Sequence, residues 1–195
     1  MTLALFDFDG TITNQDSFLK FIRFVVGDAK FVVGLIILSP ILIAFKLKII
    51  PNYKAKSIVI SYFFKGYKEV KFKNLACEFS ISQIDKIVRP KAKDRLIWHK
   101  DQGHKIVIVS ASIDYWIYPW CFKNGFELLA TKLETKDGLL TGNLLGNNCY
   151  GIEKACRIKQ NYDLSQIEYI YAYGDSNGDK EMLEVANKSF YKFFN

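Results

Sequence analysis

Three apolar segments of this chain run directly into polar residues, and this pattern constrains the fold more than any other feature. They are TLALFD (2–7), HKIVIVSAS (104–112) and EYIYAYGD (168–175), and ELLATKLE (127–134) is a fourth apolar segment. Short apolar runs that end in polar clusters are typical of buried strands. Helical patterns occupy residues 84–101, 114–124, 153–161 and 178–187. This alternation predicts an α/β fold, a Rossmann-like three-layer core with a parallel sheet covered on both faces.

Carboxylates follow the first and third of these strands. Asp7 and Asp9 lie two residues apart in ALFDFDGTIT, so on an extended chain their side chains project to the same side. Such charges need a partner when buried, and Mg²⁺ prefers carboxylate and carbonyl oxygens. The cluster GDSNGD adds Asp175 at a strand end and Asp179 at the start of the next helix. Because ligands bind at the carboxyl ends of parallel strands, we expect Asp7, Ser110 and Asp175 to meet there.

Residues 16–80 depart from this alternation and predict a separate element. The segment is helical in pattern and rich in aromatic residues, and from Lys20 to Lys73 it holds eleven Lys and Arg but only two acids. We therefore expect an inserted all-helical cap at 16–80, with residues 1–15 and 81–195 forming the α/β core. The basic excess favours an anionic substrate or an anionic surface, and a solvated helical face is the plainer alternative.

Within this cap lies the apolar run FVVGLIILSPILIAF (31–45), which contains Gly34 and Pro40. Its 15 residues are short for a membrane span, which needs about 20. We expect the run to form cap core or a helical hairpin broken at these two residues. Peripheral membrane contact through residues 31–50 is the second alternative, and a true span is the third.

Composition excludes several other classes of protein. Half of the 195 residues are hydrophobic and 15% are aromatic, which argues against disorder. The four cysteines form no CxxC pair or zinc-ligand spacing, so reduced thiols are expected. The first strand begins almost at the first residue and leaves no room for a signal peptide, which predicts a cytoplasmic protein, with membrane association as an alternative. No recognition motif supports nucleic-acid binding, so we expect no nucleic-acid partner.

Four short motifs together resemble those of the haloacid dehalogenase superfamily of phosphohydrolases. They are DFDGT near the N-terminus, VSAS after HKIVI, an isolated lysine in GIEK, and GDSNGDKEML near the C-terminus, in the order and spacing of that family. The long helical insertion is similar to that of the subfamily IB members with a helical cap. That group includes phosphoserine phosphatase and bacterial phosphatidylglycerophosphate phosphatases.

This resemblance implies a chemical role for the acids. Asp7 would be the nucleophile that forms an aspartyl-phosphate, a covalent route open to carboxylates. Asp9 would protonate the leaving group and then activate water, and repulsion between neighbouring acids favours one protonated carboxyl group. Mg²⁺ would bind Asp7, the backbone carbonyl of Asp9 and Asp175, with Asp179 supporting this shell.

The resemblance also implies a phosphate cradle. Ser110 would donate a hydrogen bond to a phosphoryl oxygen, and Lys154 would offset the charge that develops during transfer. The backbone amides around Gly10 and Thr11 would complete the cradle. Because Asp9 can supply the proton that a departing alkoxide needs, a phosphatase is favoured over a dehalogenase.

The substrate remains open at this point. We expect a small or lipid-linked phosphomonoester, because the cap is basic and carries the apolar run 31–45. Phosphoserine is an alternative, since Asp16 lies nine residues after Asp7, where the resemblance implies an acid for the substrate ammonium. Asp16 also suits a helix N-cap before SFLKFIRF. A catalytically silent membrane-binding module on the same fold is a further alternative.

Overall fold

A six-stranded sheet in the order β4-β3-β2-β1-β5-β6 forms the centre of the computed structural model, which describes residues 1–195. All neighbouring strands are parallel except β3 and β4. The strands are β1 (Thr2–Phe6), β2 (Lys105–Ile113), β3 (Glu127–Lys136), β4 (Leu139–Leu145), β5 (Tyr169–Gly174) and β6 (Lys188–Tyr191). The four strands expected from the sequence are confirmed as β1, β2, β3 and β5.

Eight α-helices and three short 3₁₀ turns complete the fold. The helices are α1 (Ser17–Val26), α2 (Asp28–Lys46), α3 (Asn52–Phe64), α4 (Glu69–Gln83), α5 (Pro90–Asp101), α6 (Asp114–Asn124), α7 (Ile152–Asn161) and α8 (Lys180–Glu184). The 3₁₀ turns are η1 (Ile84–Lys86), η2 (Leu164–Gln166) and η3 (Asn177–Asp179). The predicted helices at 114–124 and 153–161 correspond closely to α6 and α7.

Two of the predicted helices are shorter than expected. The pattern over 84–101 divides into η1 and α5, because Pro90 begins α5 and the residue before a proline, Arg89, is extended. The pattern over 178–187 gives η3 followed by only five helical residues in α8.

Side chains alternate across the central strands and build a core on each face of the sheet. On β1, Ala4 and Phe6 belong to the larger hydrophobic cluster, whereas Leu3 and Leu5 belong to the smaller one on the other face. This is the period of two that a strand imposes, with both faces buried. The predicted three-layer α/β architecture is confirmed.

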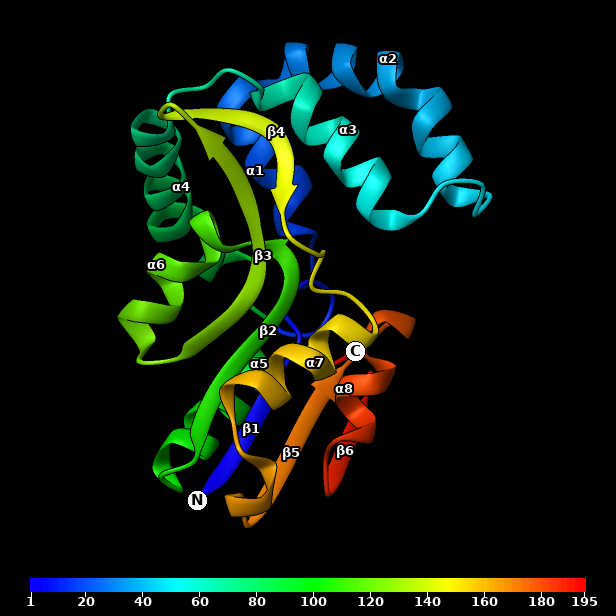
Figure 1. The fold of residues 1–195 in the computed structure, drawn as a ribbon. Helices are drawn as coiled ribbons and strands as arrows, with labels where there is room; N and C mark the ends of the chain where they lie inside the picture. Colours follow the sequence, from blue (N-terminus) through cyan, green and yellow to red (C-terminus); the bar gives the residue numbers. More distant parts are fainter.

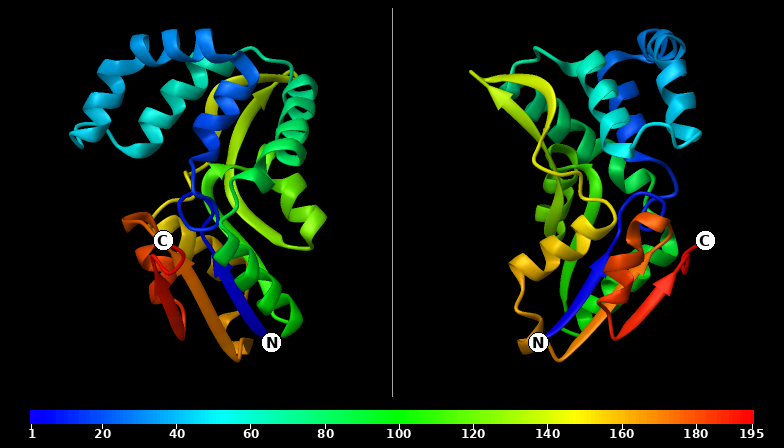
Figure 2. Two further views of the ribbon diagram at one scale, coloured as in Figure 1. Left: turned by 180° about the vertical axis from the view of Figure 1, so that it is seen from behind. Right: turned by 45° about the vertical axis from the view of Figure 1, so that its right-hand side comes forward.

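Helices α1 to α4, which are called the cap below, gather beyond the carboxyl ends of β1, β2 and β5 (Figures 1 and 2). Their interior is aromatic: Phe21 stacks on Trp116 of α6 at 4.5 Å and contacts Phe64, Phe72 and Phe79. This interior is continuous with the larger core cluster. The boundary predicted at residue 80 falls inside α4, which ends at Gln83.

Helix α2 runs unbroken from Asp28 to Lys46, so the expected break of the apolar run at Gly34 and Pro40 does not occur. A proline inside a helix leaves the carbonyl four residues earlier without its donor. Here the hydroxyl of Ser39 donates to the carbonyl of Ile36 at 2.7 Å and supplies the missing hydrogen bond. The helix bends along its length instead of ending (Figure 1). Nor is the run cap core, since Gly34 and Leu38 are its only buried residues.

The β3–β4 hairpin extends from the sheet to the cap. Asp137 and Gly138 form its two-residue turn with φ angles of 52° and 74°, as type I′ turns require. Three backbone hydrogen bonds then join the start of β4 to the connection between α3 and α4: Gly66 N–H to Leu140, Leu140 N–H to Tyr67, and Glu69 N–H to Gly138. The sheet and the cap are therefore joined through main-chain contacts.

Candidate active site

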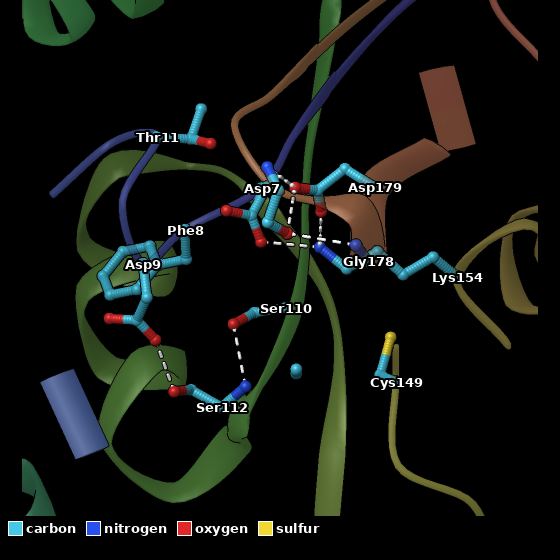
Figure 3. Close-up of polar contacts among 12 residues, drawn as sticks. Asp7, Phe8, Asp9, Thr11, Ser110, Ser112, Cys149, Lys154, Gly178 and Asp179 are labelled. Carbon is cyan, nitrogen blue, oxygen red and sulfur yellow. Dashed lines mark hydrogen bonds and ion pairs between the residues drawn. The ribbon is translucent and has the colours of Figure 1, made fainter. Parts of the chain in front are cut away.

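Asp7 occupies the first position after β1, where its backbone N–H still donates to Tyr173 of β5 at 2.9 Å. Its side chain is buried, and Oδ1 accepts a hydrogen bond from Lys154 Nζ at 2.6 Å. The same ammonium lies 2.6 Å from Asp179 Oδ1, so Lys154, which is on α7, links the carboxylates of Asp7 and Asp179 (Figure 3). Oδ2 of Asp7 accepts no hydrogen bond from the protein.

The ionisation of these three groups is set by burial and by their mutual attraction. Burial raises the pKa of Asp7 to about 7, although the charge of Lys154 opposes this shift. Burial also opposes ionisation of Asp179, but Lys154 and the hydrogen bonds from Ser176 hold its pKa below the usual value. For Lys154, burial is outweighed by Asp7 and Asp179, so its pKa is raised. The lysine therefore remains an ammonium ion.

Asp175 completes a group of three acids at the ends of β1 and β5. One carboxylate oxygen each from Asp7, Asp175 and Asp179 lies within 4.8 Å of the others. Gly10 permits this approach, because it has a φ of 91° and a Cβ there would lie 2.5 Å from Asp175 Oδ2. The Thr11 hydroxyl donates to Asp175 Oδ1 at 3.0 Å and orients it. Three converging carboxylates are a donor set that suits a hard divalent cation such as Mg²⁺.

The carboxylate of Asp9 lies outside this acidic group, because the chain turns after Asp7 instead of continuing as a strand. Its Oδ1 accepts from the backbone N–H of Ser17 at 2.6 Å, and Oδ2 accepts from the Ser112 hydroxyl (Figure 3). Ser17 is itself held by the indole N–H of Trp116 at 3.1 Å. Burial and the nearby charge of Asp16 raise the pKa of Asp9 to about 6, despite these hydrogen bonds.

Ser110 is buried on β2 and lines the same pocket as Asp7, Asp9 and Lys154. Its Oγ accepts from the Ser112 backbone N–H at 3.0 Å, so its own hydroxyl hydrogen is available to a ligand. Thr11 is engaged with Asp175 through its hydroxyl, which leaves only its backbone N–H for an anion.

The pocket lined by Asp7, Asp9, Ser110 and Lys154 has a volume of about 300 Å³ and continues into the cap. Beyond the polar end its walls are largely apolar and come from three cap helices. These side chains are Phe18 and Leu19 of α1, Leu35, Leu42 and Phe45 of α2, and Ala55 and Val59 of α3. Asp16 also lines the pocket and is the N-cap of α1, accepting from the Leu19 N–H at 3.0 Å.

Lys56 on α3 is a pocket residue that the sequence reasoning missed. Its Nζ donates to the Ala111 carbonyl at 2.6 Å and to Asn148 at 3.4 Å, so the cap reaches the core here. Burial lowers the pKa of Lys56 to about 8, although Asp9 and Asp16 oppose this shift. The sequence signal was the basic stretch YKAKS, and nothing in it distinguished Lys56 from Lys54. Ser112 was also missed, although it is the last residue of the VSAS motif.

Comparison with known proteins gives a consistent relationship. The family profile of haloacid dehalogenase-like hydrolases matches residues 4–184. Protein CicA of Caulobacter vibrioides is 35% identical over 98% of this chain and 86% of its own length. A probable phosphatase of Mycobacterium tuberculosis is 31% identical, over 62% of this chain and 42% of its own length.

Solved structures show the same fold. A Bordetella pertussis protein of unknown function has a TM-score of 0.83 at 23% identity, over 96% of this chain and 88% of that one. A phospho-aspartyl intermediate analogue of phosphoserine phosphatase has a TM-score of 0.67 at 20% identity, and the match covers 96% of this chain and 84% of that one. With the profile spanning nearly the whole sequence, this chain belongs to the haloacid dehalogenase-like hydrolases, as its four motifs predicted.

Proposed function

We propose that this protein is a Mg²⁺-dependent phosphatase that hydrolyses phosphomonoesters through an aspartyl-phosphate on Asp7. The observation that carries the proposal is the position of Asp7. Its Oδ2 is free in the pocket, while Oδ1 is held by the ammonium of Lys154. A nucleophile fixed on one side and free on the other is suited to attack at phosphorus.

Two displacements at phosphorus account for the reaction. In the first, Asp7 Oδ2 forms a bond to phosphorus, the ester P–O bond breaks, and Asp9 donates a proton to the departing alkoxide. In the second, Asp9 takes a proton from water, whose oxygen bonds to phosphorus as the bond to Asp7 breaks. The pKa of about 6 at Asp9 lets the group serve both as acid and as base near neutral pH.

The remaining polar groups of the pocket bind the phosphoryl oxygens. Ser110 has its hydroxyl hydrogen available, because its oxygen already accepts from Ser112. The backbone amides of Gly10 and Thr11 add two further donors, and the Lys154 ammonium offsets charge that develops on the oxygens. Asp179 accepts a second hydrogen bond from Lys154 and helps to fix the ammonium in place.

Mg²⁺ is the cofactor that we propose for this site. Asp7, Asp175 and the backbone carbonyl of Asp9 would hold it, and Asp179 would support them. The proximity of the three acidic side chains and the space that Gly10 leaves for Asp175 support this choice. When bound, the ion would shield the repulsion between the nucleophile and the phosphate dianion.

For the substrate, we favour a lipid-linked phosphomonoester over a small polar one. The pocket walls beyond the carboxylates are apolar, and they come from the proposed cap at 16–80. Phosphoserine is the alternative, with Asp16 as the partner of the ammonium group. A substrate carboxylate would, however, find no arginine in the pocket, where Lys56 is the one cation that the cap contributes, and Arg23 pairs with Asp28 on the surface. A cytoplasmic location at or near a membrane fits this substrate class.

Hydrolysis of p-nitrophenyl phosphate tests the enzyme assignment. We expect activity that requires Mg²⁺, loss of it in Asp7→Asn, and retention of it in Asp163→Asn, which changes an exposed carboxylate. Beryllofluoride should occupy Asp7 in the presence of Mg²⁺. Full activity of Asp7→Asn would remove Asp7 from its role, and a folded protein inactive on every ester would favour a silent module. Comparing short-chain phosphatidic acid with O-phosphoserine separates the two substrate classes.

A further inference from the structure

Helix α2 presents apolar side chains to solvent along most of its length. Ile36 is 66% exposed, Ile37 is 55% exposed and Ile43 is 58% exposed. By length and composition the helix could cross a membrane. Only 11% of its most apolar stretch is buried inside the protein. Single exposed apolar residues are ordinary, but a contiguous apolar surface marks an interaction site. A helix that is apolar on all sides is found inside protein or in contact with lipid.

The opposite side of α2 is fixed to the rest of the cap. At Gly34 the helix approaches α3 so closely that a Cβ would lie 2.3 Å from Cζ of Phe63. Leu35 and Leu42 line the catalytic pocket. A placement of α2 across a bilayer would separate it from α3 and remove this wall of the pocket. The exposed side of α2 is therefore suited to lie along a surface and not to cross it.

Cationic side chains lie at both ends of the exposed side of α2. The exposed lysines at its two ends and on the adjoining part of α3 are Lys30, Lys46, Lys48 and Lys54. The two acids between residues 20 and 73 are neutralised by their own neighbours. Asp28 lies 2.6 Å from Arg23, and Glu69 lies 2.7 Å from Lys73. The apolar surface is thus bordered by unpaired positive charge.

We propose that this docking face binds the surface of an anionic lipid bilayer. The docking face consists of Val32, Val33, Ile36, Ile37, Ile43 and Leu47, with the four lysines at its edge. Apolar side chains would enter the boundary between headgroups and acyl chains, while the lysines would contact anionic headgroups. If two copies of this chain paired through the docking face, the lysines of one copy would approach those of the other. Charge repulsion therefore disfavours a second copy as the occupant.

The docking is independent of the proposed phosphatase chemistry, because it uses none of the residues that line the polar end of the pocket. It would nevertheless bring the apolar wall of the pocket next to the bilayer, since α2 contributes to both surfaces.

Vesicle sedimentation with the full chain tests the proposal. We expect co-sedimentation with vesicles of equal parts phosphatidylcholine and phosphatidylglycerol, weaker binding to phosphatidylcholine alone, and release as salt rises. Ile36→Glu should weaken binding to the anionic vesicles by about tenfold or more. The matched control is Ile81→Glu on α4, where the wild-type side chain is 64% exposed, and it should bind like the parent.

Two further measurements keep the result interpretable. Hydrolysis of soluble p-nitrophenyl phosphate should be equal in Ile36→Glu and the parent, which shows that the variant is folded. Asp7→Asn should bind vesicles normally, so failure of the catalytic proposal leaves this one standing. No sedimentation with anionic vesicles at low salt would overturn the proposal, as would undiminished binding by Ile36→Glu. Self-association without vesicle binding would assign the face to a second copy instead.

Discussion

The ammonium nitrogen of Lys154 lies 2.6 Å from Oδ1 of Asp7, although 147 residues separate these two in the sequence. The contact is almost fully enclosed, with the lysine side chain 1% exposed and the aspartate side chain 9% exposed. Such a pair forms only when the strand end that carries Asp7 and the helix that carries Lys154 are both in place. The candidate site is therefore a product of the whole core fold.

Replacing Lys154 by methionine should damage both activity and stability. The change leaves the buried carboxylates of Asp7 and Asp179 without their partner, which costs about 3–5 kcal/mol of unfolding free energy. We expect phosphatase activity to fall by about a hundred- to a thousandfold. Denaturant unfolding and steady-state kinetics measure these losses. Lys159→Met on the exposed side of α7 is the control and should change stability by less than about 0.5 kcal/mol.

Gly10→Ala should specifically weaken the affinity of the site for the proposed Mg²⁺. A Cβ at Gly10 would lie 2.5 Å from Asp175 Oδ2 and displace this carboxylate. We expect the Mg²⁺ concentration for half-maximal activity to rise by about ten- to a hundredfold. Gly66→Ala imposes similar backbone strain, with a φ of 83°, but its Cβ meets no atom within 4 Å. An equal shift in both variants would attribute the effect to strain and not to Asp175.

Lys56→Met should raise KM more than it lowers kcat. The ammonium of Lys56 faces the pocket and contacts the Ala111 carbonyl, so it is placed to bind an anionic or acceptor group of the substrate. Losing such a charged hydrogen bond corresponds to about a tenfold rise in KM. With a soluble phosphomonoester as substrate, Lys54→Met, on the same helix but exposed, should leave KM unchanged.

The pH dependence of KM provides a second measurement on Lys56. Its pKa is lowered to about 8, so the side chain is cationic below this pH and neutral above it. We therefore expect KM of the parent to rise as pH increases through about 8, and Lys56→Met to lack this rise. A parent KM that is flat between pH 7 and 9 would contradict the assignment.

His99 should make stability depend on pH below neutrality. It is fully buried on α5, between the His104 ring nitrogen at 2.8 Å and the Tyr173 hydroxyl at 2.9 Å. Burial, together with the charges of His104 and Arg95, lowers the pKa of His99 to about 3. Below about pH 6.5 the unfolded chain binds a proton that the folded protein excludes, so stability falls as pH falls from 6.5 towards 3.

His99→Gln should flatten this dependence by up to about 1.4 kcal/mol per pH unit, the limit for one proton. Denaturant unfolding at pH 7 and pH 5 measures the slope. Tyr173→Phe removes a hydrogen-bond partner but keeps the histidine, so it should retain the slope of the parent. Equal slopes for the parent and His99→Gln would assign the acid sensitivity to other groups.

The sequence predicted the central strands well because their pattern is local. Each of the β1, β2 and β5 segments is a nearly continuous apolar run that ends in polar residues, which a strand buried on both faces requires. Strand β4 was not expected, since LLTGNLL contains polar residues and a glycine. The dipeptide Asp137–Gly138 was the signal that could have found its hairpin. Strand β6 has only four residues and is stabilised by pairing with β5.

Side-chain directions and cap contacts were less predictable. The regular spacing of Asp7 and Asp9 indicated two carboxylates on one side, but the turn after Asp7 directs Asp9 to Ser17 and Ser112. The position of Lys56 depends on how α3 packs across the sheet edge, which no local pattern encodes. The unbroken course of α2 through Pro40 likewise depends on one compensating hydroxyl, that of Ser39.

The backbone hydrogen bonds between the β3–β4 hairpin and the α3–α4 connection have a mechanical consequence. A swing of the entire cap as one rigid lid would have to break all three of them in each turnover. The half of the cap that holds these bonds is thus anchored to the sheet. Because α2 packs closely on α3 at Gly34, α2 is held to the sheet through this anchored half as well.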